Sequence, residues 1–254
     1  MFSLSGQKAL IVGVANEHSI AWGCAKALHE QGADLAITYL NDRAEGFVRP
    51  LAEQLGADII APLNVQDDAA MADLFKLIAD KWGRLDTLLH AVAFCPAEDL
   101  HGRVVDCSSQ GFTTAMDISV HSFIRMVRHA EPLMTHGGSC QTLSYYGSAR
   151  VMEHYNVMGP VKAALEASVR YMAAELGTKR ISVNALSPGP MKTRAASGIA
   201  EFDTMMDEVA ARAPTHTLTT LHDVGAYAAF LASPSARNVT GCVHMIDGGF
   251  HIMG

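Results

Sequence analysis

Seven short apolar or β-branched runs, separated by longer amphipathic stretches, constrain the fold of this 254-residue chain more than any other feature. The runs cover residues 8–14, 34–40, 58–61, 86–92, 138–144, 180–187 and 242–246. The amphipathic stretches cover residues 19–31, 43–55, 67–82, 109–132, 157–177 and 222–233. Strands that alternate with helices favour right-handed crossovers and parallel pairing. The sequence therefore predicts an α/β fold: a doubly wound, mostly parallel, seven-stranded Rossmann-like sheet with helices on both faces.

Composition indicates a soluble enzyme rather than a nucleic-acid or membrane protein. The chain is 49% hydrophobic and 18% charged, which favours one domain over residues 1–254. Its net charge of -7 and its scattered Lys and Arg side chains argue against a nucleic-acid surface. No apolar run approaches the roughly 18 residues that cross a bilayer, and the N-terminus lacks a signal-peptide pattern. We expect a cytoplasmic protein with no membrane contact.

Cysteine and histidine patterns give no sign of a metal site. The five cysteines are odd in number and form no CxxC pair, and the twelve histidines form no HxxxH or HExxH motif. Buried free thiols are the simplest interpretation of the cysteines. We predict no metal.

The first apolar run leads into a glycine at the place where nucleotide-binding loops occur. Gly13 allows a tight turn, and Ser19 is suited to cap the next helix and offer its hydroxyl. A helix N-terminus there would present N–H groups and a positive dipole to a pyrophosphate. The GxGxxG pattern is absent, so a plain α/β connection remains an alternative.

Candidate residues follow several of the predicted strands. In a doubly wound sheet the ligand lies beyond the carboxyl ends of the strands, where Gly13, Val92, Tyr145 and Met191 all fall. Leu40 follows the second strand and neither holds a ribose diol nor binds a 2'-phosphate. The lack of a cation at positions 40 and 41 favours NAD(H) over NADP(H), although Arg43 or Arg49 could fold back there.

Tyr155 and Lys162 are seven residues apart. On one helix this spacing puts the two side chains on the same face, about 10 Å apart along the axis. A tyrosine releases a proton near neutral pH only with help from a neighbouring cation, which Lys162 could supply. Taken alone, the pair also fits the exposed face of an amphipathic helix. Pro160 is compatible with this helix if the helix begins near residue 156 or 157.

Several motifs together resemble one enzyme family over essentially the whole chain. They are G13-x5-S19-I20-A21, L143-S144-Y145-x-G147, Y155-N156-V157-M158-G159-x2-K162, G189-P190-x2-T193-x-A195-A196-S197-G198-I199 and D247-G248-G249. The combination is similar to bacterial NADH-dependent enoyl-acyl-carrier-protein reductases, a divergent branch of the short-chain dehydrogenase/reductase superfamily. Most members of that superfamily space Tyr and Lys four apart and place a Ser upstream; here the spacing is seven, with Tyr145 upstream.

The resemblance implies a reaction and roles for named residues. NADH delivers a hydride to the β-carbon of a trans-2-enoyl thioester in fatty-acid elongation; Tyr155 stabilises or protonates the enolate, and Lys162 holds the nicotinamide ribose. Tyr145 lines the same catalytic site in a role that stays open. The implied cofactor contacts are Gly13, Ala15, Ser19 and Ile20 at the pyrophosphate, Leu40, Asn64 and Val65 at the adenosine, and Val92, Met191, Lys192, Thr193, Arg194 and Ala195 at the nicotinamide.

The resemblance also implies a substrate site, a lid and partners. The implied substrate contacts are Cys95, Tyr145, Tyr155, Phe202 and Met205. Residues 190–213 are expected to form a lid over the acyl chain, although a surface helix packed on the sheet is an alternative. The expected partners are acyl carrier protein and three further copies of the chain in a homotetramer.

Several positions depart from the family pattern, and one of them, Ala93, together with Leu40, keeps other functions open. Ala93 stands where glycine is common and narrows the nicotinamide site, and Asn64 replaces a frequent Asp. One alternative is a paralogue within the superfamily that acts on another keto or conjugated carbonyl substrate. The other is a non-enzymatic NAD-binding protein, which has no need of the Tyr145, Tyr155 and Lys162 set.

Overall fold

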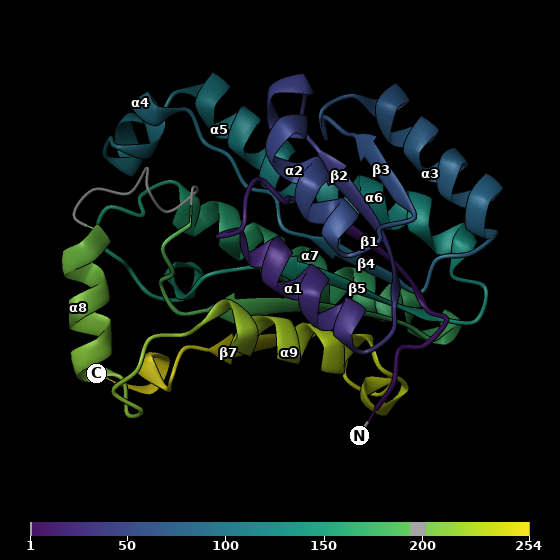
Figure 1. Ribbon diagram of the computed structural model, residues 1–254. Helices are drawn as coiled ribbons and strands as arrows, with labels where there is room; N and C mark the ends of the chain where they lie inside the picture. The colour runs from purple at the N-terminus through teal and green to yellow at the C-terminus, as the bar shows by residue number, and fades with distance from the viewer. Residues whose placement is uncertain (1, 194–201, 254) are drawn as a thin grey trace.

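The computed structural model describes residues 2–193 and 202–253 and has the predicted seven-stranded sheet at its centre (Figure 1). All neighbouring strands are parallel, in the order β3-β2-β1-β4-β5-β6-β7. The strands are β1 Lys8–Val12, β2 Asp34–Tyr39, β3 Ile59–Pro62, β4 Thr87–His90, β5 Gly138–Leu143, β6 Ile181–Pro188 and β7 Val243–Ile246. Each of the seven predicted runs therefore overlaps one strand, and β3 and β6 each extend one residue beyond the predicted run.

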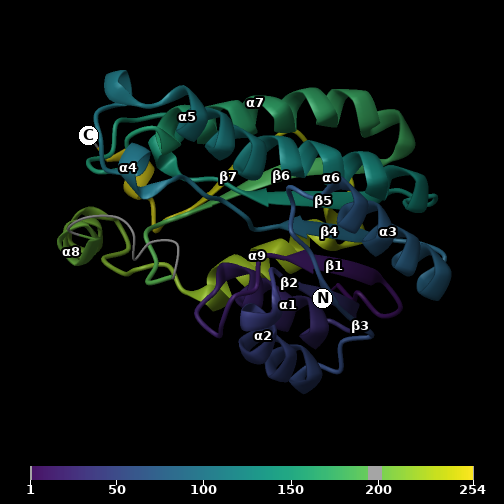
Figure 2. The same ribbon diagram turned by 90° about the horizontal axis from the view of Figure 1, so that it is seen from above.

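Helices cover both faces of the sheet, as predicted (Figure 2). The α-helices are α1 Ile20–Glu30, α2 Asp42–Gln54, α3 Asp68–Trp82, α4 Ala97–Leu100, α5 Ser109–Met116, α6 Ser122–Ala130, α7 Met158–Leu176, α8 Phe202–Arg212 and α9 Leu221–Ala232. Short 3-10 turns span Val104–Asp106, Glu131–Leu133, Tyr146–Ser148, Gly177–Lys179, Pro234–Ala236 and Phe250–Ile252. One buried apolar cluster joins the sheet to α3, α5, α6 and α7, and another joins it to α1, α2 and α9.

Two stretches differ from the prediction. The region predicted as one helix over 109–132 is α5 and α6 joined by a π-helical turn, Asp117–His121, and it ends in a 3-10 turn that contains Pro132. The extra residue of a π turn shifts the side chains that follow it around the helix axis. The four-residue helix α4 was not predicted, because one turn is too short to show an amphipathic period.

The cysteines form no disulfide, and the described residues hold neither a metal-binding group nor a membrane-spanning helix. All five cysteines are free. The part of the chain that the structure describes holds no group of three or more His, Cys, Asp or Glu side chains able to bind a metal. Within the same residues, no helix is both long and apolar enough to cross a membrane.

Candidate active site

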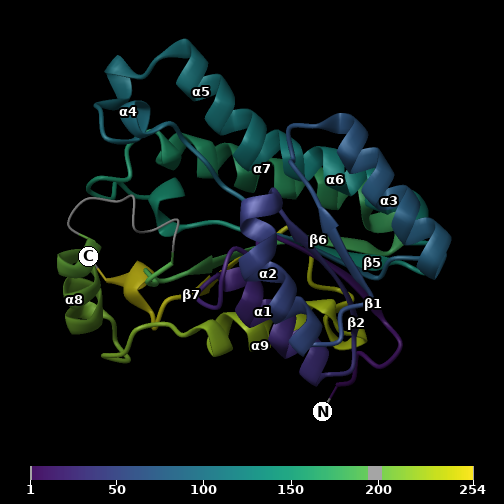
Figure 3. The ribbon, with the colours of Figure 1, turned by 45° about the horizontal axis from the view of Figure 1, so that its top comes forward.

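The predicted site residues gather at the carboxyl end of the sheet. Gly13, Val92, Tyr145 and Met191 each lie one to three residues beyond the last residue of β1, β4, β5 or β6. Helices α4 and α8 lie at the end of the molecule where the C-terminus is also found (Figure 3). The prediction of a common crevice beyond the strand ends therefore agrees with the positions of these loops.

The turn after β1 requires glycine. Gly13 has a φ of +113°, and a Cβ atom on it would lie 2.2 Å from the carbonyl oxygen of Ala91 in the neighbouring loop. Any larger residue would push these two loops apart. The glycine thus allows the β1 and β4 loops to approach each other closely.

Ser19 acts differently from the prediction. Its side chain makes no cap hydrogen bond to α1; instead its Oγ accepts from the N–H groups of Ala15, at 3.0 Å, and Asn16, at 3.1 Å. The hydroxyl therefore closes the loop, because two loop N–H groups converge on it before the helix begins. The first N–H groups of α1 have no side-chain cap, so they are available to a ligand such as a phosphate group.

The predicted adenosine contacts line the ends of β2 and β3. Leu40 is 59% exposed, Val65 is buried, and the Oδ1 of Asn64 accepts from the N–H of Gln66 at 3.1 Å. A carbonyl oxygen has two lone pairs, so Asn64 keeps one for a ligand. Arg49 bonds Glu45, with its Nε 2.8 Å from Oε1. The guanidinium of Arg49 is thus held by a carboxylate of its own helix.

Tyr155 does not lie on the helix that carries Lys162. The prediction that the two side chains share one face of a helix is therefore wrong. Helix α7 begins at Met158, so Tyr155 stands in the turn before it and Pro160 lies within the first helical turn. On either side of Tyr155, His154 has a φ of 61° and Asn156 a φ of 44°. Non-glycine residues in this region store strain, and such residues concentrate at functional sites.

Asn156 links the turn that carries Tyr155 to α4. Its Nδ2 donates to the carbonyl oxygen of Leu100 at 2.7 Å. The next backbone bond, from the N–H of Gly159 to the carbonyl oxygen of Asn156 at 3.0 Å, leads directly into α7. This link could not be predicted from the sequence, because α4 was not predicted.

Tyr145 and Tyr155 form a close ring pair. Their ring centroids are 4.8 Å apart, with the planes at 63° in an edge-to-face arrangement. A Cβ on Gly147 would lie 2.5 Å from the ring of Tyr155 and 3.2 Å from that of Tyr145. Burial raises the pKa of Tyr145 to about 12, and burial also raises the pKa of Tyr155. Both phenols are therefore proton donors at neutral pH.

Lys162 is buried, with 5% of its surface exposed, and it faces the end of β5. Its Nζ donates to the carbonyl oxygen of Leu143 at 2.7 Å, which is its hydrogen-bond partner within the described part of the chain. Burial lowers the pKa of Lys162 to about 8, and the negative charge of Glu166 acts against that shift. An ammonium group has three donors, so this one fits a pair of ligand hydroxyl groups beside the Leu143 carbonyl.

Glu166 was missed by the sequence analysis. It lies one turn after Lys162, and its Oε1 accepts from Ser144 Oγ at 2.5 Å and Ser148 Oγ at 2.6 Å. These serines flank Tyr145, so one carboxylate fixes the loop that carries this tyrosine to α7. Ser144 within the 143–147 motif and Ser148 directly after it were the available signal, but nothing in the sequence paired them with a residue about twenty positions away.

The predicted substrate contacts are placed in part. Cys95 is half-buried, and burial raises its pKa to about 11, so it remains a thiol. Met205 on α8 accepts a hydrogen bond from the Tyr145 hydroxyl at 3.4 Å. Phe202 is the first residue of α8, and its side chain lies outside what the structure describes, as do Arg194 and Ala195 altogether.

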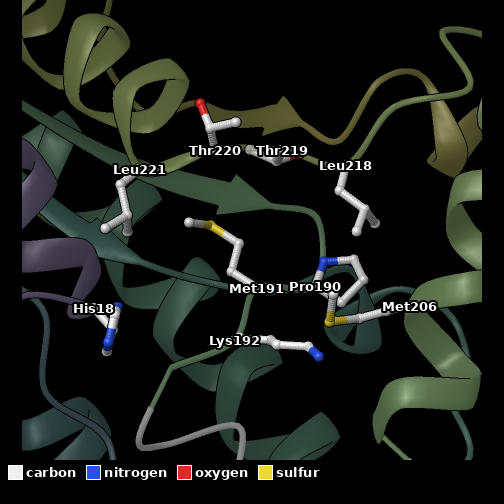
Figure 4. Close-up of a pocket in the computed structure, with 9 residues that line it drawn as sticks. All are labelled: His18, Pro190, Met191, Lys192, Met206, Leu218, Thr219, Thr220 and Leu221. Atoms are coloured by element: carbon white, nitrogen blue, oxygen red, sulfur yellow. The ribbon is translucent and has the colours of Figure 1, made fainter.

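A cavity of about 240 Å³ joins the end of β6 to α8 and α9 (Figure 4). Its lining consists of His18, Pro190, Met191, Lys192, Met206, Leu218, Thr219, Thr220 and Leu221. Met191 and Lys192 are predicted cofactor contacts, whereas neither tyrosine of the ring pair lines this cavity. The N–H of Thr193 donates to the carbonyl oxygen of Met191 at 2.8 Å, which turns the chain directly after these two residues.

The parallel sheet, the glycine turn after β1 and the uncapped start of α1 define a dinucleotide-binding protein of the Rossmann-like class. The family model described as enoyl-(acyl carrier protein) reductase matches residues 13–251. The chain belongs to this enoyl-(acyl carrier protein) reductase family.

The similarity to individual relatives extends over the full length of this chain. The chain is 48% identical over 257 residues to enoyl-acyl-carrier-protein reductase (NADH) FabI of Nostoc, with 100% of both chains covered. It is similar to the reductase of Anaplasma phagocytophilum solved with NAD, at 47% identity and a TM-score of 0.96, covering 100% of this chain and 97% of that one. It is also similar to the Bacillus cereus reductase solved with NADP+ and an indole naphthyridinone, at 42% identity and a TM-score of 0.97, with both chains covered fully.

Proposed function

We propose that this protein is an NADH-dependent enoyl-acyl-carrier-protein reductase of fatty-acid elongation. The observation that carries the proposal is the ring pair of Tyr145 and Tyr155 at the strand ends, in the same site as the buried ammonium of Lys162. The name of the Nostoc relative specifies the same reaction and the same cofactor. When bound, the nicotinamide supplies a hydride to the β-carbon of a trans-2-enoyl thioester.

Tyr155 supplies the hydrogen bond that this reaction needs. As the β-carbon is reduced, negative charge develops on the thioester oxygen, and a donor aimed at that oxygen lowers the barrier. Because burial raises the pKa of Tyr155, its hydroxyl keeps its proton and stabilises or protonates the enolate. Tyr145 packs against the edge of Tyr155 and restricts how its ring turns.

Lys162 holds the ribose next to the nicotinamide. The Leu143 carbonyl fixes one of its three N–H donors, so the other two are directed by the same contact toward the ribose hydroxyls. Its positive charge also favours the anionic state of the thioester oxygen. This charge lies in a buried environment, where it is screened less than it would be in water.

The cofactor preference rests on the residues after β2. Leu40 is an exposed apolar side chain where NADP-binding proteins place a cation, and Arg49 is held by Glu45. The Gly13 turn and the start of α1 receive the pyrophosphate, and Asn64 with Val65 borders the adenosine. We therefore assign NADH as the preferred cofactor, with NADPH used less well.

The proposal extends to a lid, a carrier and an assembly. The lid is assigned to residues 190–213, of which residues 194–201 lie outside the described part of the chain. Helix α8 belongs to this segment and reaches Tyr145 through Met205, which suits an alkyl tail. The substrate arrives on acyl carrier protein in the cytoplasm, and the enzyme acts as a homotetramer built from one domain per chain. Size-exclusion chromatography with light scattering tests the assembly independently of the reaction.

The test of the reaction follows NADH oxidation by the purified full chain. The substrates are a trans-2-enoyl thioester and, as the matched control, a 3-keto thioester of the same length, each with NADH and then NADPH. Fast turnover of the enoyl thioester that prefers NADH supports the proposal. Faster turnover of the keto thioester would assign the chain to a paralogue, and NADH binding without turnover of either substrate would indicate a non-enzymatic role.

A further inference from the structure

His90, the last residue of β4, is fully buried and has both ring nitrogens engaged. Its Nε2 lies 2.8 Å from Ser122 Oγ, and its Nδ1 lies 3.0 Å from Thr142 Oγ1 on β5. The hydroxyl of Ser122 donates its single hydrogen to the carbonyl oxygen of Ile118, at 2.6 Å. Nε2 of His90 must therefore carry the hydrogen and donate to Ser122, while Thr142 donates to Nδ1.

In this tautomer His90 is a neutral ring that lies between Thr142 on β5 and Ser122 on α6. Burial, with the positive charge of Lys162, lowers the pKa of His90 to about 3. The ring thus stays uncharged at physiological pH and is unsuited to proton transfer. What it does is join β4 and β5 to Ser122, the first residue of α6, directly after the π-helical turn.

The π-helical turn in turn holds the loop after β4. Ser119, fully buried within the turn, accepts from the N–H of Phe94 at 3.1 Å and donates to the carbonyl oxygen of Phe94 at 3.3 Å. One hydroxyl therefore satisfies both backbone polar groups of a loop residue whose own side chain is 50% exposed. Phe94 lies between Val92 and Cys95, the predicted nicotinamide and acyl contacts.

The hydrogen bonds of His90 and those of Ser119 meet on one short segment of helix. Ser122, the partner of His90, bonds back to Ile118, which is the neighbour of Ser119. Fixing Ser122 therefore fixes the rotation of the π turn, and this rotation determines whether Ser119 faces Phe94. A π turn inside a helix is rare and frequently marks a functional position. An unbroken α-helix would point the side chain of residue 119 in a different direction.

We propose that His90 and Ser119 are positioning residues, which act through the π-helical turn to hold the loop 91–95 in register with the nicotinamide and the thioester. This inference rests on the proposed function for the identity of the substrate. Its physical basis is that displacing a reacting group by about 1 Å can cost as much as 10²-fold in rate.

The test compares Ser119→Ala with Ser168→Ala in the full chain. Ser168 donates to the carbonyl oxygen of Ala164 on α7 at 2.9 Å, a bond of the same type as that of Ser122 but outside the site. The measurements are the NADH dissociation constant from fluorescence titration, kcat and KM for the enoyl thioester, and the melting temperature. NADH binding does not depend on turnover, so it tests the loop even where the proposed reaction fails.

For Ser119→Ala we expect a rise of about 3- to 10-fold in the NADH dissociation constant and a fall of about 10-fold in kcat, with Ser168→Ala near wild type. His90→Gln provides the second variant, because its amide N–H still reaches toward Ser122. The His90→Gln variant should bind NADH more tightly than His90→Ala, and the two variants should have similar melting temperatures. NADH binding and kcat within twofold of Ser168→Ala for both Ser119→Ala and His90→Ala would overturn the proposal and leave a purely structural role.

Discussion

The two halves of the sheet are built from different material. In β1 the residues Ala9 to Val12 are all apolar and at most 2% exposed. In β5 and β6 the buried positions include Gln141, Thr142 and Asn184, each fully buried. The half of the sheet around β1, the apolar half, is therefore held mainly by apolar burial. The half around β5 and β6, the polar half, also encloses polar side chains in the core.

The polar half uses these side chains to fix distant segments. Gln141 donates to the carbonyl oxygen of Ala228 on α9 at 3.0 Å, and Asn184 donates to that of Val239 before β7 at 2.8 Å. Buried hydrogen bonds are costly to break, so they select one arrangement of the loops they join. The comparison teaches that apolar burial alone holds β1, whereas β5 and β6 also select the positions of the segments that their buried polar side chains bond.

Removing the charge of Lys162 should give the largest effect. Lys162→Met keeps most of the buried volume but loses the ammonium that bonds Leu143 and is proposed to hold the ribose. We expect kcat/KM for the enoyl thioester to fall by about 10²- to 10³-fold, the range for losing a preorganised electrostatic donor. Steady-state kinetics measures the change, and Lys76→Met, at a 72% exposed position, serves as the control. A fall of less than tenfold would contradict the assigned role.

Crowding the tyrosine pair should have the next largest effect. The methyl group of Gly147→Ala would enter the space of the Tyr155 ring, so the ring must move away from its donor position. We expect kcat to fall by about 10- to 100-fold, because misplacement of a catalytic group by about 1 Å costs this much. Gly177→Ala is the matched control, since nothing lies within 4 Å of its added carbon. Equal kcat values in the two variants would argue against a geometric role for the pair.

A pH profile should show a decline on the alkaline side. Lys162 is charged below its pKa of about 8 and neutral above it, so kcat/KM should be level below pH 8 and fall up to tenfold per pH unit above it. Glu166 acts to raise this pKa, so Glu166→Gln should move the decline to lower pH while its amide oxygen still accepts from the serines. A profile unchanged by Glu166→Gln would show that the titrating group is not Lys162.

A cavity in the apolar half should change activity least. Leu10→Ala on β1 removes a fully buried side chain, and we expect a loss of about 2 to 5 kcal/mol in the free energy of unfolding. The kcat of the protein that remains folded should stay within about twofold of wild type, because this apolar side chain makes no hydrogen bond to a site residue. Denaturant unfolding checks the first value, and Leu77→Ala, at a 42% exposed position, is the control. A large loss of kcat at full folding would break the distinction between the halves.

The sequence predicted those features that depend on local pattern. The seven strands and the glycine turn at Gly13 follow from apolar periodicity and from backbone freedom, and both are present. The helical placement of Tyr155 was wrong, because the strained residues His154 and Asn156 keep it in a turn. Ser19 was expected at a helix cap and instead binds its own loop.

The missed features depend on contacts between distant parts of the chain. Glu166 meets Ser144 across 22 positions, and Asn156 meets Leu100 across 56. No period in the sequence encodes such a pair, because each partner alone reads as an ordinary polar residue. The π turn was missed for a related reason: it adds one residue to a helix whose amphipathic pattern stays nearly intact.

The site beyond the end of β5, with the ring pair of Tyr145 and Tyr155, is proposed to carry out the chemistry, while the apolar core maintains the fold. The most direct test measures kcat, the NADH dissociation constant and the melting temperature of Tyr155→Phe in one preparation, with Tyr171→Phe, 76% exposed on α7, as the control. For Tyr155→Phe we predict a fall of at least about 10²-fold in kcat, with NADH binding and melting temperature close to wild type. A kcat equal to that of Tyr171→Phe would contradict it.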